Sequence, residues 1–306
     1  MNITFCCTNT TAEPWLQGLR AAFPEATVGV WQPGAPQADV AVVWAPPQQF
    51  LDEQQALKAL FNIGAGVDAL LQLRLPPGVK VVRLDDAGMS VQMAEYVCHA
   101  VIRHFRELDA YARDVAAGKW SFRKPLIRAD FPVGVLGLGV LGERVAKALR
   151  TFEFPVHGWS RSAKTLDGVA CHSGDEQLPG FLSQCRVLVN LLPLTPETRD
   201  ILNRDTLGHL QPGGYLINVA RGAHLVERDL IHLLDNGHMA GACLDVFRTE
   251  PLPADHAFWS HPKITITPHT SARTLRDESI AQIAGKIAAL ERGEAVVGVV
   301  DTVRGY

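Results

Sequence analysis

A glycine-rich turn near the middle of the chain constrains the fold more than any other feature of the sequence. The apolar run Val133–Leu136 leads into the hexapeptide Gly137–Gly142, GLGVLG, and residues 143–149 continue with helical spacing. This order suits a pyrophosphate site, because the first glycine permits a tight turn, the second lets the backbone approach the phosphates, and the third lets helix and strand pack closely. The alternative is a glycine-rich turn without a ligand. We predict a dinucleotide here, in contact with Gly137, Gly139, Val140, Leu141 and Gly142.

Short apolar runs without strict in-out alternation occur on both sides of this turn, as expected for parallel strands covered on both faces. The first series comprises Ile3–Cys6, Val28–Trp31, Val40–Trp44, Leu60–Ile63 and Lys80–Leu84. The second comprises Val133–Leu136, Val156–Trp159, Val187–Leu192, Tyr215–Val219, Ala242–Val246 and Ile264–Thr267. The expected fold is therefore α/β with two doubly wound parallel-sheet domains, a Rossmann-type cofactor domain inserted in a smaller flavodoxin-like substrate domain.

Helical patterns indicate where the chain passes between these domains. A stripe beginning at Met93 predicts one long helix that ends near Gly118, and the polar residues Lys119–Asp130 then form an arm or linker. A last helical pattern, with Gly293 as its stop, follows the second sheet and would return to the first domain. We predict a substrate domain of residues 1–95 and 277–306 and a cofactor domain of residues 96–276.

Composition excludes several classes of function. The 29 basic and 32 acidic residues give a net charge of −3 without a basic face, so neither nucleic acid nor a membrane surface is an expected partner. No stretch is apolar over the length of a membrane span. The six cysteines form no CxxC pair and no metal-type spacing, which predicts reduced thiols, no metal site and a cytoplasmic protein.

The strand after the glycine turn indicates which dinucleotide is bound. An acid at its end would bind the ribose 2′-hydroxyl of NAD, but this chain has Ser160, Arg161 and Ser162 there. A guanidinium and two hydroxyls attract a 2′-phosphate through charge-assisted hydrogen bonds. We predict NADPH in preference to NADH; the alternative is an exposed polar turn that binds neither 2′ group strongly.

Three polar residues follow later strands of the second series: Arg221, Glu250 and His269. A 2-keto acid needs a cation for its carboxylate, a group that polarises its carbonyl, and a proton donor for the oxygen that becomes an alkoxide. Arg221 suits the first two needs and His269 the third, while Glu250 would orient the ring and favour its protonated form. Taken singly, each is more simply explained by a structural role: a surface ion pair, a helix N-terminal charge or a hydrogen-bonded loop residue.

The order of these residues behind a mid-chain glycine turn resembles the D-isomer-specific 2-hydroxyacid dehydrogenase family. The shared blocks include Leu192–Thr198, Asn218–Gly222, Leu244–Pro251 and Pro268-His269. A narrower resemblance, to family members that reduce glyoxylate and hydroxypyruvate, rests on Asn62–Asp68, Gly88–Met93, Trp159–Arg161 and the closing segment Asp301–Tyr306.

The resemblance implies NADPH-dependent reduction of glyoxylate to glycolate and of hydroxypyruvate to D-glycerate, with Arg221, Glu250 and His269 as catalytic residues. It implies a homodimer built around the cofactor domain and the arm. It also implies further cofactor contacts at Pro193, Thr195, Ala220 and Asp245; a surface acid is the alternative interpretation of Asp245. The chain departs from many relatives at Leu191-Leu192, where they carry a histidine, and at Thr270–Ala272, where they carry small apolar residues and a glycine.

The substrate site is expected at a second glycine turn. Gly64, Ala65 and Gly66 follow the Leu60–Ile63 run, where backbone N–H groups would hold a carboxylate. An ordinary strand-to-helix turn is the alternative. Trp44 and Met89 are candidates for pocket walls, and equally for core residues.

Three other functions fit parts of the sequence. A dinucleotide-sensing regulator would use the glycine turn with little turnover, but it leaves the Arg-Glu-His set and the absence of a basic face unexplained. A methyltransferase shares only the glycine turn. An NAD-dependent dehydrogenase of other specificity, working in the oxidative direction, differs in cofactor and flux, and the Ser160-Arg161 pair argues against it.

Overall fold

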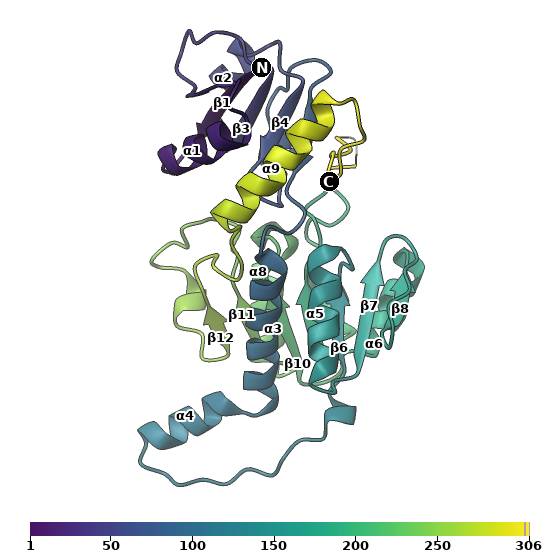
Figure 1. The fold of residues 1–306 in the computed structure, drawn as a ribbon. Coiled ribbons are helices and arrows are strands. Elements are labelled where there is room, and N and C mark those ends of the chain that lie inside the picture. The colour runs from purple at the N-terminus through teal and green to yellow at the C-terminus, as the bar shows by residue number, and fades with distance from the viewer. Residues whose placement is uncertain (303, 306) are drawn as a thin grey trace. The chain divides into compact units, whose positions relative to one another are not determined.

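Two parallel sheets organise the chain in the computed structural model, which describes residues 1–302, 304 and 305 (Figure 1). They belong to two compact units, one formed by Met1–Met89 with Arg273–Tyr306 and the other by Ser90–Ala272. Both sheets are doubly wound, which confirms the predicted fold class. Val303 and Tyr306, in the closing segment that contributes to the family resemblance, lie outside the described residues.

The first unit has the strand order β2-β1-β3-β4-β5, with every pair parallel, which is the flavodoxin-like order. Helices α1 and α9 cover one face through residues such as Leu19 and Ile283, and α2 covers the other through Phe50. The strands are β1 (Asn2–Cys7), β2 (Thr27–Val30), β3 (Val40–Trp44), β4 (Ala59–Asn62) and β5 (Lys80–Arg83), and the helices are α1 (Glu13–Ala22), α2 (Gln48–Glu53) and α9 (Arg276–Glu291).

The second unit has the order β12-β11-β10-β9-β6-β7-β8, again all parallel. The chain order reverses between β6 and β9, and such a switch point is where doubly wound sheets bind ligands at the carboxyl ends of their strands. The strands are β6 (Val133–Leu136), β7 (Val156–Ser160), β8 (Ala170–Ser173), β9 (Val187–Asn190), β10 (Gly214–Asn218), β11 (Met239–Leu244) and β12 (Ile264–Ile266).

Helices cover both faces of this larger sheet. On one face, α3 and α5 pack on β6, β9 and β10 through residues such as Val97, Val145 and Ile217. On the other, α6, α7 and α8 pack on Leu188 and Leu216. The helices are α3 (Met89–Phe105), α4 (Leu108–Ala116), α5 (Val140–Thr151), α6 (Leu178–Ser183), α7 (Arg204–Gly208) and α8 (Glu227–Asp235). No described helix is long and apolar enough to cross a membrane.

Two details of the second unit differ from the sequence expectation. The expectation of a single helix from Met93 to Gly118 is wrong. The helix is interrupted at Glu107, whose φ of 52° is left-handed, so that α3 and α4 are separate helices. No residue of α4 is buried, so the buried stripe ends at Phe105. Strand β8 was not predicted, because this edge strand is half-buried or exposed and carries no apolar run.

The unit boundaries lie slightly before those expected at 95/96 and 276/277. On one side, α3 begins at Met89 and Met93 already contributes to the core of the second unit. On the other, Thr274 and Leu275 belong to the first unit, where they donate hydrogen bonds to the Ile63 and Ala87 carbonyls.

Candidate active site

The Gly137–Gly142 turn joins β6 to the N-terminus of α5 and has the shape that a dinucleotide needs. Gly137 has a φ of 95°, and a Cβ there would lie 2.8 Å from the Leu191 carbonyl oxygen. A Cβ on Gly142 would overlap the Gly137 carbonyl, so no larger residue fits. A Cβ on Gly139 meets nothing within 4 Å, so its missing side chain leaves open space at the helix N-terminus. Packing thus explains two of the glycines, and the third leaves room for a phosphate to approach.

Ser160, Arg161 and Ser162 lie at the end of β7. Ser160 is buried and its hydroxyl donates to the Ser162 carbonyl at 2.8 Å, while Arg161 and Ser162 are exposed. The pKa of the nearby Glu197 carboxyl is lowered, first by a hydrogen bond from Thr195 and also by the charge of Arg161. The charge of Arg161 therefore acts on the loop that carries Thr195, another of the predicted cofactor segments.

A buried polar network that the sequence analysis missed shapes the loops after β9 and β10. Asn190 donates to Asn218 at 3.0 Å and contacts His224 Nδ1 at 3.0 Å, and all three side chains are fully buried. The other ring nitrogen of His224 contacts the carbonyl of Pro193 at 3.2 Å. The Asn218 amide donates to the Arg221 carbonyl, and its oxygen accepts from the Ala220 N–H. The only sequence signals for this network are Asn190 and Asn218, each at the end of a strand, and His224 in the turn that follows β10.

Arg221 leaves the end of β10 in an extended conformation, and its guanidinium donates to the Ala220 carbonyl at 2.8 Å. Ala220 itself is buried. A Cβ on the following Gly222 would overlap the Phe247 backbone. This close approach sets the Arg221 loop against the loop that carries Glu250.

Glu250 and His269 form a direct pair, in which His269 Nδ1 and Glu250 Oε2 are 2.7 Å apart. The other Glu250 oxygen accepts from the Phe247 N–H at 2.9 Å. Partial burial alone would raise the pKa of the Glu250 carboxyl, but hydrogen bonds from His269 and Phe247, with the charges of His269 and Arg221, lower it overall. The side chains remain 35% and 46% exposed, so a small molecule can reach them.

Asp245 follows β11 and is fully buried. Its carboxylate accepts hydrogen bonds from the Thr267 hydroxyl and from the N–H groups of Thr270 and Ser271, and its carbonyl accepts from the His269 N–H. Asp245 therefore holds the loop that carries His269, in addition to any contact with a cofactor.

In the first unit, the Gly64–Gly66 turn is held from below by Asn62. The buried Asn62 amide donates to the carbonyls of Gly64 and Gly66 at 2.9 and 3.0 Å. Among the residues that the structure describes, none accepts a hydrogen bond from the Ala65 or Gly66 N–H. The exposed Trp44 ring lies against Gly64, whereas Met89 is buried at the start of α3.

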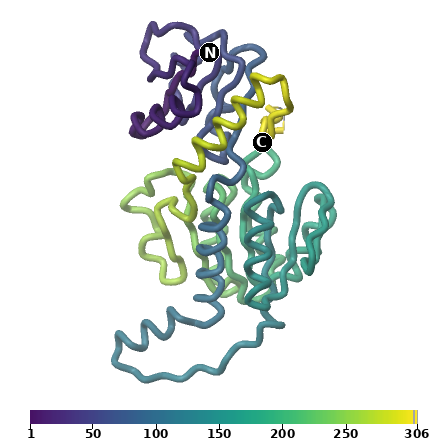
Figure 2. Tube along the Cα trace, in the orientation of Figure 1, coloured from purple at the N-terminus to yellow at the C-terminus, as the bar shows by residue number. Residues whose placement is uncertain are grey.

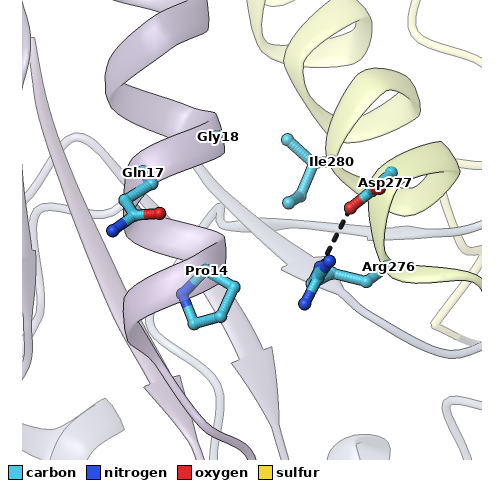
Figure 3. Close-up of a pocket in the computed structure, with 6 residues that line it drawn as sticks. All are labelled: Pro14, Gln17, Gly18, Arg276, Asp277 and Ile280. Atoms are coloured by element: carbon cyan, nitrogen blue, oxygen red, sulfur yellow. Dashed lines mark hydrogen bonds and ion pairs between the residues drawn. The ribbon is translucent and has the colours of Figure 1, made fainter.

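One hollow is lined by none of the predicted site residues. A surface hollow of about 380 Å³ is lined by both α1 and α9, and Pro14, Gly18 and Ile280 are among its lining residues (Figure 3). Arg276 at its rim pairs with Asp277. Within the described part of the chain, no three His, Cys, Asp or Glu side chains gather as a metal site.

A dinucleotide turn at the switch point of a Rossmann-type sheet, with an Arg-Glu-His set on the later strand ends, is the arrangement of a nicotinamide-dependent dehydrogenase. Comparison with known proteins gives the family. The chain belongs to the D-isomer-specific 2-hydroxyacid dehydrogenases: the family description "D-isomer specific 2-hydroxyacid dehydrogenase, NAD binding domain" matches residues 98–271.

Full-length relatives agree with this assignment. The chain is 49% identical over 313 aligned positions to glyoxylate/hydroxypyruvate reductase A of Serratia proteamaculans, with complete coverage of both proteins. It also matches a D-isomer specific 2-hydroxyacid dehydrogenase of Xanthobacter autotrophicus Py2 solved with NADPH and MES, with a TM-score of 0.95, 40% identity and coverage of 100% and 99%. An NADPH-dependent glyoxylate/hydroxypyruvate reductase of Sinorhizobium meliloti, solved with NADP and sulfate, matches with a TM-score of 0.94, 34% identity and the same coverage.

Proposed function

We propose that the chain catalyses NADPH-dependent reduction of small 2-keto acids, glyoxylate to glycolate and hydroxypyruvate to D-glycerate. The observation that carries this proposal is the Glu250–His269 pair, 2.7 Å apart and within the field of Arg221. The names of the relatives from Serratia proteamaculans and Sinorhizobium meliloti support these substrates.

In this mechanism Arg221 binds and polarises the substrate. Its planar guanidinium offers several N–H donors, which suit the carboxylate and the keto oxygen of one small molecule. Holding both groups fixes the carbonyl carbon in one orientation, and the positive charge stabilises negative charge that develops on the oxygen. The cofactor, when bound, supplies the hydride.

His269 supplies the proton. A carboxylate only accepts hydrogen bonds, so the contact with Glu250 assigns a proton to Nδ1 of His269. Nε2 is then the ring nitrogen that gives its proton to the keto oxygen, which leaves a neutral imidazole and a hydroxyl. Glu250 stays ionised, fixes the ring and stabilises the imidazolium before transfer.

Rates with a small panel of substrates test the proposal. We would measure oxidation of NADPH and NADH by the purified chain with glyoxylate, hydroxypyruvate and pyruvate. NADPH-dependent turnover of the first two acids, well above that of pyruvate, is the expected result. Turnover with NADH and larger keto acids would favour a dehydrogenase of other specificity, and cofactor binding without turnover would favour a sensor.

The NADPH preference is assigned to the turn at Ser160–Ser162, where Arg161 carries the charge for a 2′-phosphate. The cofactor complexes of the two solved relatives support this choice. A Ser160→Asp carboxylate would repel the 2′-phosphate of NADPH and accept a hydrogen bond from the ribose 2′-hydroxyl of NADH. The ratio of kcat/KM for NADPH to that for NADH should therefore fall by about tenfold or more. Ser183→Asp, on α6, is the matched control. An unchanged ratio would contradict the role of this turn.

We further propose a homodimer formed through the arm. Figure 2 shows α4 and the following segment extending away from the sheet of the second unit. This segment exposes Trp120 fully and Phe122 to 87%, which is an unusual density of apolar surface for a chain in water. Sedimentation should give twice the chain mass, and a Trp120→Ser, Phe122→Ser double variant should give a monomer; a wild-type monomer would refute the proposal.

We also propose a cytoplasmic location, which the six unpaired cysteines support.

A further inference from the structure

A chain of side-chain hydrogen bonds runs from helix α3 to the loop that carries His269. Tyr96 on α3 contacts the Thr267 hydroxyl at 2.6 Å and Cys243 Sγ at 3.3 Å. Thr267, directly after β12, contacts Asp245 Oδ1 at 2.6 Å. Tyr96 and Thr267 also line a small cavity at the surface of the second unit, together with Arg103 and Thr265. None of the proposed catalytic steps uses these hydroxyls.

The hydrogen bonds from Tyr96 through Thr267 to Asp245 all donate in the same direction. The Asp245 carboxylate only accepts, so Thr267 donates to it, and the Thr267 oxygen then accepts the Tyr96 O–H. Burial raises the pKa of Tyr96 far above its ordinary value, which keeps its proton in place. The Tyr96 oxygen is left to accept from Cys243, a weak donor.

Asp245 in turn holds the backbone at His269 and at the two residues that follow it. Its carboxylate binds the N–H groups of Thr270 and Ser271 at 2.8 Å each, and its carbonyl binds the His269 N–H at 2.8 Å. His269 has a φ of 51°, a left-handed conformation that is uncommon for a residue other than glycine. Such a conformation persists only where surrounding contacts hold it.

We infer that Tyr96 and Thr267 are positioning residues for His269, which act through Asp245. The inference rests on the proposed function, because it takes His269 as the acid. Thr267 orients the Asp245 carboxylate, Tyr96 orients the Thr267 hydroxyl, and the carboxylate keeps residues 269–271 in the geometry that aims the ring. A small displacement of a reacting group lowers the rate strongly. Loss of the Tyr96–Thr267–Asp245 hydrogen bonds should therefore lower kcat, although no contact with the substrate is removed.

Replacing Thr267 is the main test, with the full-length chain and NADPH. Thr267→Val keeps the shape and removes the hydroxyl, and we expect kcat for hydroxypyruvate to fall about tenfold while KM for hydroxypyruvate stays within about twofold. Thr267→Ser restores a hydroxyl and should recover most of the rate. Thr265→Val is the matched control, since Thr265 lies on β12 beside the same cavity but takes no part in the Tyr96–Thr267–Asp245 hydrogen bonds.

Amide exchange separates positioning from a merely structural role. In Thr267→Val, deuterium uptake should rise in the peptide that covers Thr270 and Ser271, whereas uptake in β10 and Tm should match those of Thr265→Val. A wild-type kcat, or a loss of rate accompanied by equal destabilisation in both variants, would overturn the inference. If the wild-type chain reduces no keto acid, the proposed function fails, and the exchange data still decide whether Thr267 holds this loop.

A double-variant cycle tests the order of the chain. Tyr96→Phe removes one hydroxyl at the far end and should lower kcat about threefold in the wild-type background. In the Thr267→Val background it should change kcat no further, because Tyr96 acts through Thr267. Independent, multiplying effects of the two substitutions would show that Tyr96 acts by another route.

Discussion

The two units build their candidate sites from different materials. In the second unit, charged and polar side chains are tied to one another, as in the Glu250–His269 pair and the buried Asn190–Asn218–His224 network. In the first, a backbone turn at Gly64–Gly66 is held by Asn62 and covered by an aromatic ring. Proton transfer needs ionisable groups in fixed positions, whereas recognition of a small carboxylate needs only oriented N–H groups. Substitutions at Glu250 and His269 should therefore change kcat, and those in the Gly64–Gly66 turn should change KM for the keto acid.

The largest effect is expected from His269→Ala. Loss of the acid should lower kcat by about 10³-fold while Kd for NADPH, followed by nucleotide fluorescence, stays within about twofold. His209→Ala is the control, because His209 is exposed and its ring contacts a carbonyl of the preceding turn, that of Asp205. A variant that retains more than about a tenth of the wild-type kcat would remove His269 from its role.

Glu250→Gln should produce a loss that depends on pH. Because the pKa of Glu250 is lowered in the folded chain, its charge and the stability it contributes are present above the ordinary carboxyl range, and are lost only as the pH falls through the lowered pKa. Without that charge, no carboxylate assists proton transfer from the ring. We expect kcat of the variant to be about thirtyfold low from pH 6 to pH 8.5, and this deficit to shrink only as the pH falls through the lowered pKa of the wild-type carboxyl.

A deficit that stays constant as the pH falls below the ordinary carboxyl range would show that Glu250 only orients the ring. The comparison is a pH–rate profile of wild type and variant at saturating NADPH. Glu227→Gln provides a control, because Glu227 also contacts a histidine, His256, at 3.2 Å on the same unit. Its profile should match that of the wild type.

The glycine turn of the second unit should respond differently at its two ends. Gly139→Ala introduces a Cβ where the structure has open space, so the chain should fold with unchanged Tm while KM for NADPH rises about tenfold. Gly142→Ala makes a Cβ overlap the Gly137 carbonyl and should lower Tm instead. Unchanged KM for NADPH in Gly139→Ala would mean that this turn is not a phosphate site.

Features carried by neighbouring residues were predictable from the sequence. The Gly137–Gly142 turn and most strands are local patterns, and both sheets follow from their alternation with helices. Arg221, Glu250 and His269 were candidates because each follows an apolar strand, and the structure brings the last two into contact. The candidate roles of these three residues followed from their residue types alone.

Features that depend on distant partners were not predictable. Tyr96 lies 171 positions before Thr267, and the Asn190–His224 contact spans 34 positions, so neither pairing leaves a local pattern. The break after α3 depends on one left-handed residue, Glu107, whose type gives no signal. Strand β8 is defined by its pairing with β7, since its own residues are too polar to indicate a strand.

The smallest effect is expected in the first unit, from Gly64→Ala. The added Cβ would lie 2.5 Å from Cζ3 of Trp44, a ring that is 38% exposed and can therefore move outward. The chain should fold, with a changed Trp fluorescence, and KM for hydroxypyruvate should rise about fivefold while kcat changes less than about twofold. Gly29→Ala on β2, where a Cβ meets nothing within 4 Å, should leave KM and kcat as in the wild type. A fall in kcat at constant KM would break the division of labour between the units, because it would mean that the Gly64 turn contributes to the chemical step rather than to substrate binding.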